Sequence, residues 1–88
     1  MVSRMVVLNF KDGLNTAAVS NIINFLKSFE STITMRHNGR IANCKSLISL
    51  INLGAEPFSE VEVSAEGPNE ANEITSFIEF LQNMADTN

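Results

Sequence analysis

Apolar and polar residues alternate with a period of two in several short stretches of the chain. The clearest is 60–65, where Val61, Val63 and Ala65 alternate with polar residues and predict a strand with one buried face. Ile33 and Met35 alternate with polar residues at 32–36, an apolar run at 5–10 ends in a turn signal, and 40–43 follows a hairpin turn, so four strands are predicted, at residues 5–10, 32–36, 40–43 and 60–65. Asn38-Gly39 separates the second strand from the third and is the dipeptide that best suits a two-residue type I′ hairpin turn.

A helical period replaces the period of two in three other segments. Apolar residues recur at intervals of three and four from Thr16 to about Ser28, and again from about Asn69 to Met84, so both segments predict amphipathic helices. A shorter helix is expected to open at Ser46, a favourable N-cap residue, and to stop at Gly54. The apolar residues of this short helix nearly surround its axis, so some of them should remain exposed.

The predicted order is strand, helix, strand, strand, helix, strand, helix. Strands with a single apolar face, combined with three helices, favour an α+β fold in which an antiparallel sheet carries its helices on one face. The 88 residues, 44% of them hydrophobic, are expected to form one domain spanning 1–88.

Charge is distributed unevenly along the chain. Six basic and two acidic residues give 1–45 a net charge of +4, whereas 46–88 hold eight acidic residues and no lysine or arginine. We interpret these charges as solvated faces rather than as a functional dipole. Spaced basic residues without interleaved aromatics, in a chain of net charge −4, argue against direct nucleic-acid binding.

The candidate chemistry is sparse. Cys44 is the only cysteine, so no internal disulfide can form, and it is expected to be a buried apolar side chain rather than a reactive thiol. One thiol and one histidine at this separation give no metal site, and no cofactor is expected. No apolar run approaches the ~18 residues needed to span a membrane, and the N-terminal run is too short for a signal peptide. The chain is therefore predicted to be cytoplasmic, without membrane contact.

Four motifs, in their order and spacing, resemble the HPr phosphocarrier family of the bacterial sugar phosphotransferase system across nearly the whole chain. They are Asp12-Gly13-Leu14 before a helix, the Asn38-Gly39 hairpin, Lys45-Ser46-Leu47 at a second helix, and Val63-Ser64-Ala65-Glu66-Gly67 before the last helix. The resemblance implies an open-faced sandwich of four antiparallel strands and three helices, which agrees with the hydrophobic pattern. It also implies a protein that is not an enzyme.

The resemblance implies a phosphorylated histidine directly after the Gly-Leu pair, which takes a phosphoryl group from enzyme I and passes it to sugar permeases. This chain has Asn15 there, and the delocalised lone pair of a carboxamide nitrogen cannot attack phosphorus as a neutral imidazole can. The family's arginine, a bidentate phosphate clamp, is replaced by Ala17, and the proline after it by Ala18. Asn15 is instead expected to cap the helix.

The resemblance also implies a second site, a serine at the start of the second helix that HPr kinase/phosphorylase modifies with ATP. Ser46 keeps this serine, although an ordinary helix cap would by itself explain it. A phosphate there would add a charge of about −1.5 to −2 at the positive end of the helix macrodipole. Leu47, Ile48 and Ile51 would form the apolar patch through which the family docks its partners, although such residues taken alone are more often part of a core.

At positions 15 and 46 the chain resembles the Crh-type branch of the family. That branch lacks the histidine, keeps the serine, and acts when phosphorylated as co-repressor of a LacI-type transcription factor. The chain departs from that branch at Ala17-Ala18, where an Arg-Pro pair is usual. It also retains only Lys27 among the basic residues common on the docking face, so binding to acidic enzyme I should be weak or absent.

The sequence therefore favours a regulatory protein of carbon catabolite control, switched at Ser46. Two alternatives stay open: a divergent phosphocarrier that relays phosphoryl groups from enzyme I to sugar permeases through another nucleophile, for which His37 is the only histidine, and an interaction scaffold that is never phosphorylated. The predicted partner-binding residues are Asn15, Ala17, Lys27, Leu47, Ile48 and Ile51.

Overall fold

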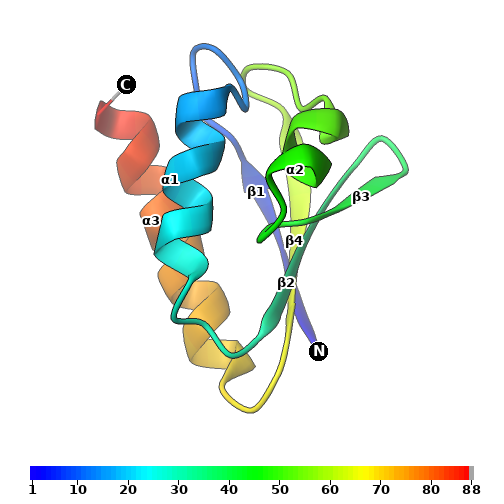
Figure 1. The fold of residues 1–88 in the computed structure, drawn as a ribbon, viewed down its shortest axis with the longest axis vertical. Helices are drawn as coiled ribbons and strands as arrows, with labels where there is room; N and C mark the ends of the chain where they lie inside the picture. Colours follow the sequence, from blue (N-terminus) through cyan, green and yellow to red (C-terminus); the bar gives the residue numbers. More distant parts are fainter. Residues whose placement is uncertain (88) are drawn as a thin grey trace.

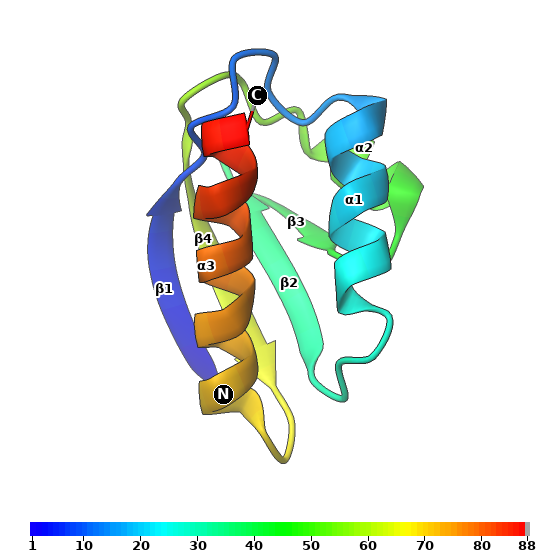
Figure 2. The same ribbon diagram turned by 90° about the vertical axis from the view of Figure 1, so that its left-hand side faces the viewer.

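A computed structural model describes the backbone of residues 1–87 and the side chains of residues 1–84. Its elements are β1 (Val2–Val7), α1 (Thr16–Leu26), β2 (Thr32–His37), β3 (Arg40–Asn43), α2 (Leu47–Leu53), β4 (Glu60–Glu66) and α3 (Glu70–Thr87). The four strands form one antiparallel sheet in the order β1-β4-β2-β3, and the three helices lie on one of its faces (Figures 1 and 2). The predicted α+β open-faced sandwich is confirmed.

The core lies between the sheet and the helices. Across the central strands Ile33 pairs with Ala65 and Met35 with Val63, and all four side chains are fully buried. The alternation that predicted these strands thus reports which face the helices cover. The helices complete the core with side chains on the apolar faces read from the sequence, among them Val19, Ile22, Leu26, Ile74, Phe77 and Leu81.

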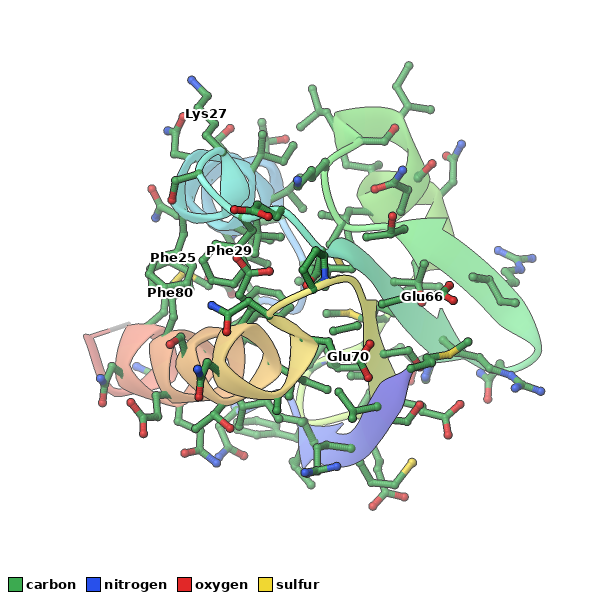
Figure 3. The ribbon with its side chains drawn as sticks, turned by 90° about the horizontal axis from the view of Figure 1, so that it is seen from below. Phe25, Lys27, Phe29, Glu66, Glu70 and Phe80 are labelled. Atoms are coloured by element: carbon green, nitrogen blue, oxygen red, sulfur yellow. The ribbon has the colours of Figure 1, made fainter. Side chains whose placement is uncertain are left out.

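Aromatic side chains fill the space between α1 and α3. The rings of Phe25 and Phe80 stack face to face, with centroids 4.1 Å apart and an interplanar angle of 9°, and Phe29 packs against Phe25 at 5.3 Å (Figure 3). These contacts join the first helix to the last and so fix how α1 sits over the sheet.

The local turn signals are confirmed. Asn38 and Gly39 have φ values of 50° and 80°, as the type I′ turn between β2 and β3 requires. Ser46 caps α2, and Gly54 ends it in the left-handed conformation with φ 70°.

The first strand is misplaced in the sequence prediction by three residues. It was expected at 5–10, but β1 spans Val2–Val7. Leu8 and Phe10 are buried, at 1% and 2% exposure, although they lie in irregular backbone, where the Leu8 N–H donates to the Ser59 carbonyl at 2.8 Å. Their apolar character reflects packing of the loop onto the core rather than strand pairing.

Glu73 of α3 holds the connection between α1 and β2. Its Oε2 accepts from the Glu30 N–H at 3.1 Å, and its Oε1 accepts from the Ser31 N–H at 2.9 Å. The adjacent Ser31 side chain, these N–H groups of Ser31 and Glu30, and the charge of Lys45 hold the pKa of Glu73 below its ordinary value. The carboxylate therefore stabilises the fold above the unfolded-state pKa of a glutamate, and this contribution is lost as the pH falls through the lowered pKa.

We expect Glu73→Gln to lower the free energy of unfolding at pH 7 by about 1–2 kcal/mol, because a neutral amide replaces a charged acceptor that is partly exposed. The difference from wild type should shrink as the pH falls through the lowered pKa of Glu73, because the wild-type carboxylate is then protonated as well. Urea unfolding of both proteins at pH 7 and over a series of acidic pH values measures this. Glu79→Gln, on the exposed side of the same helix, is the matched control, and coincident wild-type and Glu73→Gln curves at pH 7 would refute the role.

Candidate functional site

The first predicted site lies at the start of α1, and Asn15 occupies it as a helix cap. Its backbone is extended (φ −81°, ψ 174°), and its side-chain Oδ1 accepts from the Ala18 N–H at 2.9 Å. The expectation that Asn15 caps the helix is confirmed. Its amide is therefore engaged with the backbone in addition to lacking a nucleophilic nitrogen.

Two loops at one end of the molecule set the position of this cap. The segment leading into α1 packs against the segment between α2 and β4, and the two lie side by side in both ribbon views (Figures 1 and 2). At the contact Gly13 has φ +65°, and a Cβ built on it would lie 2.8 Å from the Ala55 carbonyl oxygen. A glycine there allows the close approach that places Asn15 at the helix start.

A small pocket of about 70 Å³ opens beside Asn15. Ala17, at the position where the resemblance implies an arginine, lines this pocket with a methyl group. The pocket's charged lining is one ammonium, Lys11, and one carboxylate, Asp12, which repels an anion. No imidazole or thiol belongs to the described residues that line the pocket, so it lacks both the nucleophile and the clamp of a phosphohistidine site.

The second predicted site lies at the start of α2. Ser46 has extended backbone (φ −114°, ψ 118°), and its Oγ accepts from the Ser49 N–H at 3.3 Å. The hydroxyl therefore caps the helix at a partly exposed position. The neighbouring ammonium of Lys45 is directed elsewhere, because its Nζ donates to the Phe29 carbonyl at 2.7 Å.

The helix that follows Ser46 has a buried and an exposed apolar face. Leu50 and Leu53 are buried in the core, whereas Leu47, Ile48 and Ile51 are 42%, 69% and 44% exposed. The prediction that this short helix exposes part of its apolar surface is confirmed. The three exposed side chains form the apolar patch of α2, directly after Ser46.

Sequence reasoning missed Ile41, which is 68% exposed on β3 and lines a groove together with Ile48. The signal was present, because Ala42 is next to it in a strand and only one of two consecutive residues can face the core. Choosing which one faces outward required the register of β3 on β2.

The predicted partner-binding residues do not all lie together. Asn15 and Ala17 stand at the first turn of α1, whereas Lys27 follows its last turn and points away from the body of the molecule (Figure 3). A helix of 11 residues is about 17 Å long, so one phosphate group cannot touch both ends.

The remaining candidate groups are remote from both helix starts. His37 ends β2 beside the hairpin turn, where its Nδ1 lies 3.4 Å from the Glu60 carbonyl oxygen. Cys44 is fully buried, and burial raises the pKa of its thiol to about 12, which confirms a packing role. Among the described residues no group of three histidine, cysteine or carboxylate side chains could hold a metal ion, and no helix is long and apolar enough to cross a membrane.

Comparison with known proteins adds the family. Residues 2–83 match the family model described as PTS HPr component phosphorylation site. The phosphocarrier protein HPr of Vibrio cholerae is 29% identical over 84 residues, which cover 96% of this chain and 99% of that protein.

Solved structures share the fold. HPr-C-His from Thermoanaerobacter tengcongensis has a TM-score of 0.87 at 23% identity, covering 93% of this chain and 92% of that one. Crh, the Bacillus subtilis catabolite repression containing protein, has a TM-score of 0.75 at 24% identity, covering 94% and 95%. At these identities the likeness concerns the fold alone.

Proposed function

This chain belongs to the HPr family of phosphotransferase-system components, and from that premise we propose that it is a regulatory member, phosphorylated at Ser46 by HPr kinase/phosphorylase in carbon catabolite control. Members of this family are phosphocarriers rather than enzymes. The proposal assigns the chain to the histidine-lacking, Crh-type branch and to the cytoplasm. Its effects would then be exerted through binding to other proteins.

The contrast between the two helix starts carries the proposal. Position 15 holds an amide that serves as a cap and has no nucleophilic nitrogen. Position 46 holds a hydroxyl at a partly exposed helix start, next to the exposed side chains of Leu47 and Ile48. A kinase needs both an accessible hydroxyl and a surface to dock on, and α2 offers the two together.

Phosphorylation would change this surface electrostatically. Transfer from ATP forms a bond between Ser46 Oγ and the γ-phosphorus, breaks the bond from that phosphorus to ADP, and passes the hydroxyl proton to the kinase. The phosphate adds a charge of about −1.5 to −2 where the helix macrodipole is positive. The apolar patch of Leu47, Ile48 and Ile51 then acquires a negative edge.

A partner that binds the Ser46-phosphorylated form needs an apolar surface with a cation beside it. The Crh-type assignment implies a LacI-type transcription regulator as that partner. Enzyme I, by contrast, should bind weakly or not at all, because Asn15 and Ala17 leave the first site without a phosphate acceptor or clamp and Lys27 lies at the far end of α1.

The deciding experiment is incubation with active HPr kinase and ATP-Mg, followed by mass measurement of the intact chain. We expect one phosphate on wild type and none on Ser46→Ala. Ser49→Ala is the matched control, because it removes a hydroxyl on the same helix and keeps the backbone N–H that Ser46 caps, so it should be modified like wild type. An unmodified wild-type chain, with a kinase shown to modify an authentic HPr, would overturn the proposal.

A phosphoryl relay is the second candidate, because the similar protein of Vibrio cholerae is a phosphocarrier. In this chain a relay needs another acceptor, and His37 supplies the only imidazole. Its position at the β2–β3 hairpin, away from α1, disfavours it (Figure 1). If neither HPr kinase nor enzyme I modifies the chain, the remaining function is that of an interaction scaffold that binds through the apolar patch.

A further inference from the structure

The hairpin between β2 and β3 carries the only Asn-Gly dipeptide of the chain. Glycine has no Cβ, so the backbone nitrogen of Gly39 is the least hindered that can follow an asparagine. The space around it is open, because no described heavy atom lies within 4 Å of a Cβ built on Gly39. The turn projects from the body of the molecule, and Asn38 is exposed (Figure 1). The Asn38 carboxamide is therefore accessible both to this nitrogen and to water.

The Gly39 N–H is free to react. In a two-residue hairpin the last ladder bonds join the flanking residues, here His37 and Arg40, and leave the N–H groups of the turn itself out of the ladder. No acceptor among the described residues takes the Gly39 N–H. A bond from this nitrogen to Cγ of Asn38 closes a five-membered ring, which is the route by which an asparagine side chain is attacked by its own backbone.

The same carboxamide has an imidazole beside it. Nδ2 of Asn38 lies 3.2 Å from Nε2 of His37, and Nδ1 of that ring lies 3.4 Å from the Glu60 carbonyl oxygen. A carbonyl oxygen only accepts, so the contact with Glu60 places the ring proton on Nδ1 and leaves the lone pair of Nε2 facing the amide. An imidazole takes up and releases protons near neutral pH, and a departing amide nitrogen needs a proton.

We propose that Asn38 is a site of self-modification, at which the chain converts its own asparagine to aspartate or isoaspartate while His37 carries the proton. The Gly39 nitrogen bonds to Cγ of Asn38 and loses its proton, which reaches Nε2 of His37 through solvent. Nε2 then gives a proton to the side-chain nitrogen, the Cγ–Nδ2 bond breaks, and ammonia leaves. Water opens the resulting imide at either carbonyl, which yields the two products and leaves the imidazole as it began.

The modification would change both the charge and the length of the hairpin. Each product adds a carboxylate, which makes the net charge of −4 more negative by one. Isoaspartate also adds a carbon to the backbone of a two-residue turn, which strains the pairing of His37 with Arg40. Arg40 joins this hairpin to the end of α2, because its guanidinium donates to the Asn52 carbonyl at 3.2 Å. The isoaspartate form should therefore disturb the C-terminal end of α2.

The test is incubation of the purified full chain at neutral pH, followed by digestion and mass measurement of the peptides. We expect the mass gain of one deamidation to appear first on the peptide that contains Asn38, with aspartate and isoaspartate forms that separate by chromatography. His37→Gln keeps a polar side chain but cannot carry the proton, so it should react severalfold more slowly. Conversion that begins at another asparagine, or equal rates in wild type and His37→Gln, would overturn the proposal.

The same comparison in urea separates the folded contact from the local sequence. Unfolding removes the Glu60 contact that orients the ring, so wild type and His37→Gln should then react at nearly equal rates. A difference as large in urea as in buffer would contradict the role of the folded geometry.

Gly39→Ala tests the attacking nitrogen. Its methyl group meets no described atom within 4 Å, so the chain should fold, but the added Cβ hinders ring closure and should slow the reaction. An unchanged rate in Gly39→Ala would exclude the Gly39 nitrogen as the nucleophile and so refute the mechanism. Because no kinase or ATP is present in these incubations, their outcome leaves the proposal for Ser46 untouched.

Discussion

The double variant Asn15→His/Ala17→Arg should accept a phosphoryl group from phosphoenolpyruvate and enzyme I, whereas the wild-type chain should carry none. The fold already supplies the helix start, because Asn15 sits at the N-cap of α1 and the pocket beside it is formed. What is missing is chemical: an unshared nitrogen electron pair to attack phosphorus, and a guanidinium to neutralise the transferring group. The two substitutions restore both.

The two single variants separate the contribution of the nucleophile from that of the guanidinium. Asn15→His alone should accept phosphate about a hundredfold more slowly than the double variant, because the clamp is absent. Ala17→Arg alone should stay unlabelled, since a cation cannot replace a nucleophile. Acid-labile radioactive label is the measurement. Label on the wild type that disappears in His37→Ala would contradict this account and favour the relay.

Gly13→Ala should destabilise the chain far more than Gly39→Ala. Both glycines have positive φ, 65° and 80°, so both substitutions incur about 1–2 kcal/mol of backbone strain. Only at Gly13 would the new methyl group meet backbone, 2.8 Å from the Ala55 oxygen, whereas no described heavy atom lies within 4 Å of a Cβ at Gly39. We therefore expect a loss of about 3–4 kcal/mol for Gly13→Ala, strain and overpacking together, and about 1–2 kcal/mol for Gly39→Ala, from strain alone.

This difference is large for a domain of this size, whose free energy of unfolding is expected to be about 4–13 kcal/mol. Urea unfolding of both variants gives the two values directly. The same overlap should displace the loop that places Asn15, so the Ala18 amide should shift in NMR spectra of Gly13→Ala and not of Gly39→Ala. Equal losses of stability in the two variants would show that the contact with Ala55 is unimportant.

Sequence prediction succeeded where the deciding interaction is local. The hairpin turn at Asn38-Gly39 was predicted correctly because both residues tolerate positive φ. The two ends of α2, at Ser46 and Gly54, were predicted correctly because capping involves residues within one turn. It failed at the first strand because the apolar residues Leu8 and Phe10 are buried by a loop that packs on the core. An apolar pattern indicates which residues are buried, but it does not show whether they lie in a strand. The end of β1 is decided by its pairing with β4.

The sequence by itself determined the chemistry available to this protein. It contains no histidine after Gly13-Leu14, no arginine at position 17, and a serine at position 46, and no arrangement of the backbone can change those functional groups. It determined the fold class as well, because period-two and helical patterns depend on geometry that repeats along the chain.

Only the tertiary structure decided which of these groups share a surface. It buried Leu50 while exposing Ile48, and it set Ile41 beside Ile48 at an edge of the sheet. It also brought Glu73 to the backbone of Glu30 and Ser31, more than forty positions away in the chain. The reason is physical: exposure and long-range contact depend on strand order and helix packing, which no short stretch of sequence encodes alone.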